Sequence, residues 1–264
     1  MLRRMPGGCC QARALAAALL AVAALAATGC GANGAGSRGE VVISAATSLK
    51  SAFTSYGARF GAAEAQFSFA GSDELAAQIR SGARPDVFAS ANTKLADELF
   101  AQGLVERPRV FASNRLVLAV PAEAANVRSL GDLAKRDVTL VVGAPSTPIG
   151  AYTRRVLGRL DAATRDAILA NVRSNEPDVG GISAKLAQGA ADAGLLYVTD
   201  VVATNGRLKA IELPARLQPQ VAYAVAVVKG ADNRAGAQAF VAGLLDGAGA
   251  EALAKAGFAP PPES

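Results

Sequence analysis

The sequence predicts an α/β protein of two lobes, each with a mainly parallel sheet flanked by helices, joined by two crossover strands. Short apolar segments alternate with segments of helical periodicity along residues 40–258, which is typical of parallel sheets covered on both faces. Gly and Pro residues around Pro121 divide this part of the chain, and so does an apolar strand near residue 222. These are the two places where we expect the chain to cross between the lobes.

The segments up to the first crossover follow this alternation. Leu49, Phe53, Tyr56 and Phe60 recur at helical spacing, and the segment 72–82 has acidic residues in its first turn and a Gly at its end. The elements expected here are strands at 41–46, 66–70, 86–90 and 115–121, and helices at 48–60, 72–82 and 92–103.

The remaining segments continue the pattern. The elements expected here are a short helix at 129–137, a strand at 138–144, a helix beginning near Gly150, a helix at 182–189, strands at 193–198, 209–214 and 221–228, and helices at 234–247 and 249–257. We expect residues 40–118 and 224–259 to form the first lobe, residues 119–223 the second, and residues 260–264 a disordered tail.

The N-terminal segment reads as an export signal. Residues 1–13 are basic and residues 14–27 are almost wholly apolar, too short a run to span a bilayer comfortably. The end of this segment at Cys30 resembles the lipobox of bacterial lipoproteins. We therefore expect residues 1–29 to be a signal peptide and Cys30 to be lipidated. Residues 30–39 would form a flexible tether that holds the protein at the outer face of the cell membrane or in the periplasm. An ordinary signal peptide with a stray cysteine is the alternative.

The composition excludes several classes of function. There is no His, and the three cysteines all lie within the first 30 residues, which excludes Ser-His-Asp and Cys-His catalysis and most zinc sites. The net charge is +5, but the leader contains three arginines and no acidic residue; without these arginines, 24 basic residues stand against 22 acidic ones. No basic stripe with interleaved aromatic residues indicates nucleic-acid binding.

Four loop-to-helix junctions and one tyrosine are the candidate binding elements. In open α/β sheets, ligands bind at the carboxyl ends of strands, and helix N-termini bind anions without any Lys or Arg. The candidates are Ser48 in AATSLK, Ser72 in FAGSDEL, Ile149 in GAPSTPIGAY, Val179 in PDVGGIS, and Tyr197 in AGLLYVTD. Each also has a structural explanation, since a serine can cap a helix for about 1 kcal/mol and a tyrosine can be a core residue.

Taken together, these motifs resemble those of a known family. AATSL, FAGSDELAAQI, PDVFASAN, APSTPIGAY, DVGG and AGLLYVTD follow one another in the order found in the periplasmic molybdate-binding proteins of ABC transporters. The resemblance runs from about residue 41 to residue 258. It implies the type II periplasmic-binding-protein fold, in which two lobes close over a tetrahedral oxyanion.

The resemblance also implies roles for individual residues. Ser48 would bind the anion through its hydroxyl and N–H, and Ser72 would take the place of the serine in the family's second loop. Ile149 and Val179 would donate through their backbone N–H groups, and Tyr197 would bind through its phenol. Ile149 departs from the pattern because the family often has Ala there. The implied ligand is molybdate or tungstate, held by hydrogen bonds with no metal ion bound directly by the protein and no cofactor. The implied partner is an ABC transporter permease, and we expect a monomer.

Alternative functions remain open from the sequence alone. A binding protein for another oxyanion such as sulfate would use the same donors. Organic acids and amino acids usually require an Arg or a carboxylate in the cleft, and none of the five candidate residues is either. The segment from Thr47 to Lys50 faintly resembles the S-x-x-K element of serine β-lactamases, but no K-T-G is present. A purely structural lipoprotein is a further alternative. We therefore expect a binding protein and not an enzyme.

Overall fold

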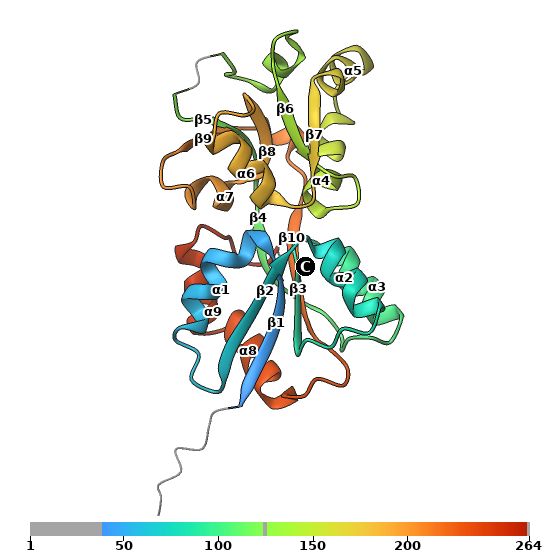
Figure 1. Cartoon of the computed structure of the whole chain (residues 1–264), viewed down its shortest axis with the longest axis vertical. Helices are drawn as coiled ribbons and strands as arrows, with labels where there is room; N and C mark the ends of the chain where they lie inside the picture. The colour runs from blue at the N-terminus through green and yellow to red at the C-terminus, as the bar shows by residue number, and fades with distance from the viewer. Residues whose placement is uncertain (1–38, 124–125, 263–264) are drawn as a thin grey trace, which may run out of the picture. The chain divides into compact units, whose positions relative to one another are not determined.

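Two five-stranded sheets organise the protein (Figure 1). The structure, a computed structural model, describes residues 39–123 and 126–262. In this part the strand orders are β2-β1-β3-β10-β4 and β7-β6-β8-β5-β9, and none of its helices has the length and apolar character needed to cross a membrane. The predicted signal peptide, Cys30 and residues 31–38 of the predicted tether lie outside the described residues.

The first sheet contains the N-terminal strands together with a late one. Its strands are β1 (Glu40–Ala46), β2 (Glu64–Ala70), β3 (Val87–Ser90), β4 (Arg109–Asn114) and β10 (Val221–Val227). Its helices are α1 (Lys50–Gly57), α2 (Ser72–Arg80), α3 (Thr93–Ala101), α8 (Arg234–Leu245) and α9 (Ala248–Lys255), and a 3-10 turn, η1 (Thr47–Leu49), precedes α1.

Helices cover both faces of the first sheet. Phe88 of β3 belongs to one hydrophobic cluster with Leu75 of α2, whereas its neighbour Val87 belongs to another with Phe53 of α1 and Phe240 of α8. Successive strand residues point to opposite faces, so every residue of β3 is buried. The strands of the sequence are continuously apolar because helices cover both faces of the sheet.

The second sheet follows the same plan. Its strands are β5 (Leu116–Pro121), β6 (Leu140–Gly143), β7 (Val172–Glu176), β8 (Ala193–Tyr197) and β9 (Leu208–Glu212). Its helical elements are η2 (Leu130–Ala134), α4 (Pro148–Leu157), α5 (Ala162–Ala170), α6 (Val179–Ala187), α7 (Val198–Val202) and η3 (Ala215–Leu217).

Both sheets are mixed. The pairs β1-β2, β1-β3, β6-β7 and β6-β8 are parallel, and the strands next to the crossovers pair in the antiparallel sense, β10 with β3 and β4, and β5 with β8 and β9. The fold is the two-lobe α/β type II arrangement, with its antiparallel pairs concentrated where the chain passes between the sheets.

The two crossing segments lie against each other. The first passes from β4 to β5 through a single residue, Arg115. The second leads from β9 to β10, and its Gln218 donates through Nε2 to the Leu116 carbonyl at 2.8 Å while accepting from the Leu116 N–H at 3.3 Å. One amide group therefore ties both crossings together. The lobe boundaries at 118/119 and 223/224 stay predictions.

Several elements differ from those predicted. The structure adds β4, α5, β7 and α7, and the segment expected as a short helix at 129–137 forms only the 3-10 turn η2. Both added strands lie at sheet edges and carry polar residues, as in RVFASN and VRSNE, so they lack the apolar run that marks a central strand. Of the predicted tail, residues 260–262 are described, and Ser113 Oγ donates to the Pro260 carbonyl at 2.7 Å.

Candidate functional site

A small cavity lies where loops of the two sheets meet. All five predicted residues line it: Ser48, Ser72, Ile149, Val179 and Tyr197. They come from the ends of β1, β2, β6, β7 and β8, or from the helix that follows each strand. The empty volume is ≈ 240 Å³ and includes space that is open to solvent, so the enclosed part is smaller still. The cavity therefore suits a small solute.

Ser48 and Ser72 each stand in the first turn of a helical segment that has no side-chain cap. The first N–H groups of a helix have no partner within it, so both turns direct free donors toward the cavity. The Ser72 hydroxyl accepts from the Ala91 N–H at 3.1 Å, which leaves its own hydrogen available. Both side chains are buried, so their donors are shielded from bulk water.

Ile149 presents the one uncapped N–H of the first turn of α4. Thr147 Oγ1 accepts from the Gly150 N–H at 3.0 Å and donates to the Ala144 carbonyl at 2.8 Å, and Pro148 has no N–H. Position 150 requires glycine because the backbone of Ala144 approaches it closely: a Cβ there would lie 1.9 Å from the Ala144 carbonyl oxygen. This tight loop holds the Ile149 N–H in place.

Val179 begins α6 in a similar way. Asp178 Oδ1 accepts from the Gly181 N–H at 3.1 Å, so the N–H groups of Val179 and Gly180 remain free for a ligand. The second oxygen of Asp178 accepts from Thr47 Oγ1 at 2.9 Å. A Cβ on Gly180 would lie 3.2 Å from Thr47 Cγ2, so the two lobes approach closely beside the cavity.

Tyr197 supplies a phenol without a partner. Its side chain is 1% exposed, and its Oη has no hydrogen-bond partner in the described part of the chain. Leaving such a group unpaired costs about 1–3 kcal/mol. Burial raises the pKa of Tyr197 well above its ordinary value, so the phenol keeps its hydrogen. An acceptor in the cavity would satisfy this donor.

The lining of the cavity contains few charged side chains. Among the described residues that line it there is no Lys, Arg or Glu, and the one acid is Asp178, whose two oxygens are occupied as described above. No group of three or more His, Cys, Asp or Glu residues that could hold a metal ion occurs in the described ranges. The site offers neutral N–H and O–H donors, which is chemistry for an anion rather than for a metal cation.

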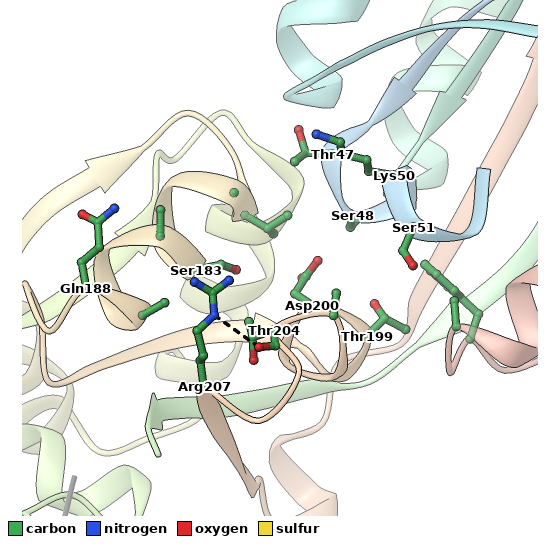
Figure 2. Close-up of a pocket in the computed structure, with 17 residues that line it drawn as sticks. Thr47, Ser48, Lys50, Ser51, Ser183, Gln188, Thr199, Asp200, Thr204 and Arg207 are labelled. Carbon is green, nitrogen blue, oxygen red and sulfur yellow. Dashed lines mark hydrogen bonds between the residues drawn. The ribbon is translucent and has the colours of Figure 1, made fainter. Parts of the chain in front are cut away.

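A larger open pocket adjoins the cavity and shares Thr47, Ser48 and Val179 with it (Figure 2). Figure 2 shows Asp200 and Arg207 of the second lobe across this pocket from the first. Burial raises the pKa of Asp200 to about 7, against the opposing effect of the Tyr197 N–H that donates to it. A buried carboxyl that titrates near neutrality therefore stands beside the candidate site.

Sequence reasoning missed two contacts that hold the site. Thr47 and Asp178 form the contact between lobes, and Tyr223 of β10 hydrogen-bonds Ser48, with 3.0 Å between Oη and Oγ. From the sequence, Asp178 could be interpreted as a helix cap and Tyr223 as a lone phenol in an otherwise apolar strand. Neither pattern indicates which residue the side chain contacts.

This chain is similar to known proteins in sequence. A family model described as bacterial extracellular solute-binding protein matches residues 41–259. The molybdate-binding protein ModA of Mycobacterium tuberculosis is 38% identical over 227 residues, which cover 84% of this chain and 85% of ModA.

Two solved structures have the same fold. The periplasmic molybdate-binding protein of Azotobacter vinelandii has a TM-score of 0.75 at 21% identity and covers 84% of this chain and 99% of its own. The sulfate-binding protein SubI of Mycobacterium tuberculosis has a TM-score of 0.73 at 16% identity and covers 84% of this chain and 87% of its own.

Facing helix ends from two α/β lobes, joined by two crossing segments, define a solute-binding protein, which carries its ligand without transforming it. The chain belongs to the bacterial extracellular solute-binding protein family, and the match spans nearly all of the described residues. Members of this family work outside the cytoplasm, so the protein is exported.

Proposed function

We propose that this protein captures molybdate, or tungstate, and delivers it to an ABC importer. The observation that carries the proposal is the meeting of neutral donors from Ser48, Ser72, Ile149, Val179 and Tyr197 around one cavity that has no Lys or Arg in its described lining. A tetrahedral dianion has four acceptor oxygens and no donor, which complements this lining. The 38% identity with ModA supports molybdate as the oxyanion.

Neutral donors are sufficient for tight binding. A hydrogen bond to a charged group contributes roughly 1.5–3 kcal/mol, so half a dozen contribute about 9–18 kcal/mol. A nanomolar complex requires about 12 kcal/mol. The difference covers desolvation and the ordering of the site, and the absence of a cationic side chain favours release to the importer.

Sulfate is the second candidate. The observation that favours it is the fold shared with a sulfate-binding protein, and sulfate would use the same donors. Sulfate is smaller than molybdate, so the spacing of the donors decides between the two anions. Protonated phosphate is disfavoured because it must donate a hydrogen, and the one carboxylate of the lining, Asp178, already accepts from Gly181 and Thr47.

A thermal-shift series with molybdate, tungstate, sulfate and phosphate tests the proposal. At 1,000 times its dissociation constant a ligand stabilises the folded protein by about 4 kcal/mol, which raises the melting temperature of a protein of this size by roughly 8–16 °C. We expect this rise with molybdate and tungstate only. A rise with sulfate alone would favour the second candidate, and no rise with any of the four anions would overturn the proposal.

We further propose that Cys30 is lipidated and holds the monomeric protein beside the membrane, where the permease receives the ligand. The support is the lipobox-like sequence that ends at Cys30 and the Gly-rich segment that follows it. Replacing Cys30 with Ser should release the protein from the membrane fraction of cells. Membrane association that is unchanged in Cys30→Ser would refute the anchor.

A further inference from the structure

We propose that Tyr223 is a positioning residue for the anion site: its phenol donates to Ser48 Oγ and thereby turns the Ser48 hydrogen into the cavity. This inference rests on the proposed function, because it concerns how Ser48 meets the anion. Tyr223 is absent from the cavity lining, and its Oη lies 3.0 Å from Ser48 Oγ. Tyr223 therefore acts on the ligand through its neighbours, and its hydrogen bond to a residue of the lining is the one to Ser48.

The position of the Tyr223 ring is fixed by its neighbours. The residue lies in β10, which pairs with both β3 and β4, and its side chain is 0% exposed. The ring packs edge-on against Phe258 at 5.3 Å and against Tyr197 at 5.8 Å between centroids. The phenol oxygen therefore has little freedom to leave Ser48.

The direction of the Ser48–Tyr223 hydrogen bond decides what Ser48 offers to the ligand. A serine hydroxyl has one hydrogen and two lone pairs. If Ser48 donated its hydrogen to Tyr223, its hydroxyl would turn only lone pairs toward an anion, and the anion would repel these lone pairs. A Ser48 that accepts from Tyr223 keeps its hydrogen for the anion. The Ser48 hydroxyl can donate to an anion only in the second arrangement.

The ligand selects this direction. A dianion only accepts, so a Ser48 hydroxyl that meets it gives its single hydrogen to the anion. A phenol can donate as well as accept, so Tyr223 then donates its own hydrogen to Ser48 Oγ, which lies 3.0 Å away.

The two hydroxyls of Tyr223 and Ser48 therefore form a short relay that ends at the anion. Burial raises the pKa of Tyr223 well above its ordinary value, so the phenol keeps its hydrogen near neutral pH.

The test is a double-mutant cycle on molybdate affinity by calorimetry, with Tyr223→Phe, Ser48→Ala and the double variant. Tyr223→Phe removes one oxygen and keeps the ring packing. We expect it to weaken binding about 10-fold in the wild-type background and less than twofold in the Ser48→Ala background, since Ser48 is then no longer present to be oriented. Tyr56→Phe is the matched control, because Tyr56 is a buried tyrosine that donates to the Phe240 carbonyl away from the cavity.

Anion-free melting curves of all variants identify losses caused by poor folding.

The outcomes separate this inference from the proposed function. A wild-type protein that binds molybdate while Tyr223→Phe binds within twofold of it would overturn the relay alone. An equal loss from Tyr223→Phe in both backgrounds would also overturn it, because it would show a general packing role. A wild-type protein that binds neither molybdate nor tungstate would overturn the proposed function, and the relay with it.

Discussion

Thr47 Oγ1 donates to Asp178 Oδ2 at 2.9 Å, and these two residues are 131 positions apart in the chain. Thr47 precedes Ser48 in the first lobe, and Asp178 precedes Val179 in the second. One hydrogen bond between lobes therefore stands directly beside two of the proposed ligand donors. It holds the two sides of the cavity at a fixed separation.

Removing this bond should speed the release of the ligand. A hydrogen bond to a carboxylate contributes roughly 1.5–3 kcal/mol, so Thr47→Val should raise the dissociation rate constant of molybdate about 10- to 100-fold and change the association rate constant little. Stopped-flow displacement by tungstate measures the rate. Thr54→Val, at an exposed position of α1, is the control. Dissociation that is equally slow in Thr47→Val and Thr54→Val would show that the contact does not retain the ligand.

Tyr197→Phe should separate stability from affinity. The Tyr197 phenol is buried without a partner in the described residues, so its removal should leave the anion-free protein as stable as before, or more stable by up to about 3 kcal/mol. Molybdate affinity should fall at least 10-fold, because the ligand loses a donor. Chemical unfolding and calorimetry measure the two effects.

Tyr56→Phe should give the opposite pattern. Its phenol donates to the Phe240 carbonyl at 3.2 Å, so the variant should lose about 1 kcal/mol of stability and keep its affinity. If both tyrosine variants lost stability and both kept affinity, Tyr197 would be an ordinary core residue.

Gly150→Ala should damage the site through the backbone. Its new Cβ would lie 1.9 Å from the Ala144 carbonyl oxygen and 2.6 Å from that of Gly143, so the first turn of α4 must move and carry the Ile149 N–H with it. We expect a loss of about 1–3 kcal/mol in stability and at least a 10-fold loss of affinity.

The control for this variant is Gly61→Ala, where a Cβ meets nothing within 4 Å. It should change the free energy of unfolding by less than about 0.5 kcal/mol and leave affinity unaltered. A Gly150→Ala protein that resembled Gly61→Ala in both measurements would show that the loop is not as tight as described.

Asp200 should make stability depend on pH. Burial raises its pKa to about 7 in the folded protein from an ordinary value of 3.8, and the charge of Asp178 adds to the rise. Between these two values the folded protein keeps a proton that the unfolded chain has lost, so the contribution of Asp200 to stability falls as pH rises from about 4 to about 7 and is level above.

Asp200→Asn keeps an acceptor for the Tyr197 N–H and removes the ionisation. It should be more stable than the wild type at pH 8, by up to about 4 kcal/mol, and the difference should vanish near pH 4. Chemical unfolding at several pH values measures this, with Asp97→Asn at an exposed position of α3 as the control. Parallel pH curves for Asp200→Asn and the wild type would contradict the assignment.

The sequence identified the loops of the candidate site because their chemistry is local. Ser48, Ser72, Ile149 and Val179 each stand at a helix start that follows a strand, and Tyr197 is a phenol at the end of an apolar strand. Small and hydroxyl residues at such junctions are visible without knowledge of the tertiary fold. What they bind stays a proposal.

The other features of the fold and the site depend on contacts between distant residues, which no local sequence pattern encodes. The hydrogen bond between Tyr223 and Ser48 joins residues 175 positions apart, and it needs the path of β10 through the first sheet. The edge strands β4 and β7 escaped prediction because half-exposed polar strands have no apolar run. The antiparallel pairs of both sheets likewise arise from how the chain returns between the lobes.

The most direct test of the central claim is a crystal structure of the protein with tungstate, whose anomalous scattering locates the anion. The account predicts one anion in the small cavity, with its oxygens about 2.6–3.2 Å from Ser48 Oγ, Ser72 Oγ, Tyr197 Oη and the N–H nitrogens of Ile149 and Val179. An anion bound instead beside Lys50 and Arg207 in the larger pocket, or an empty cavity at saturating tungstate, would contradict it.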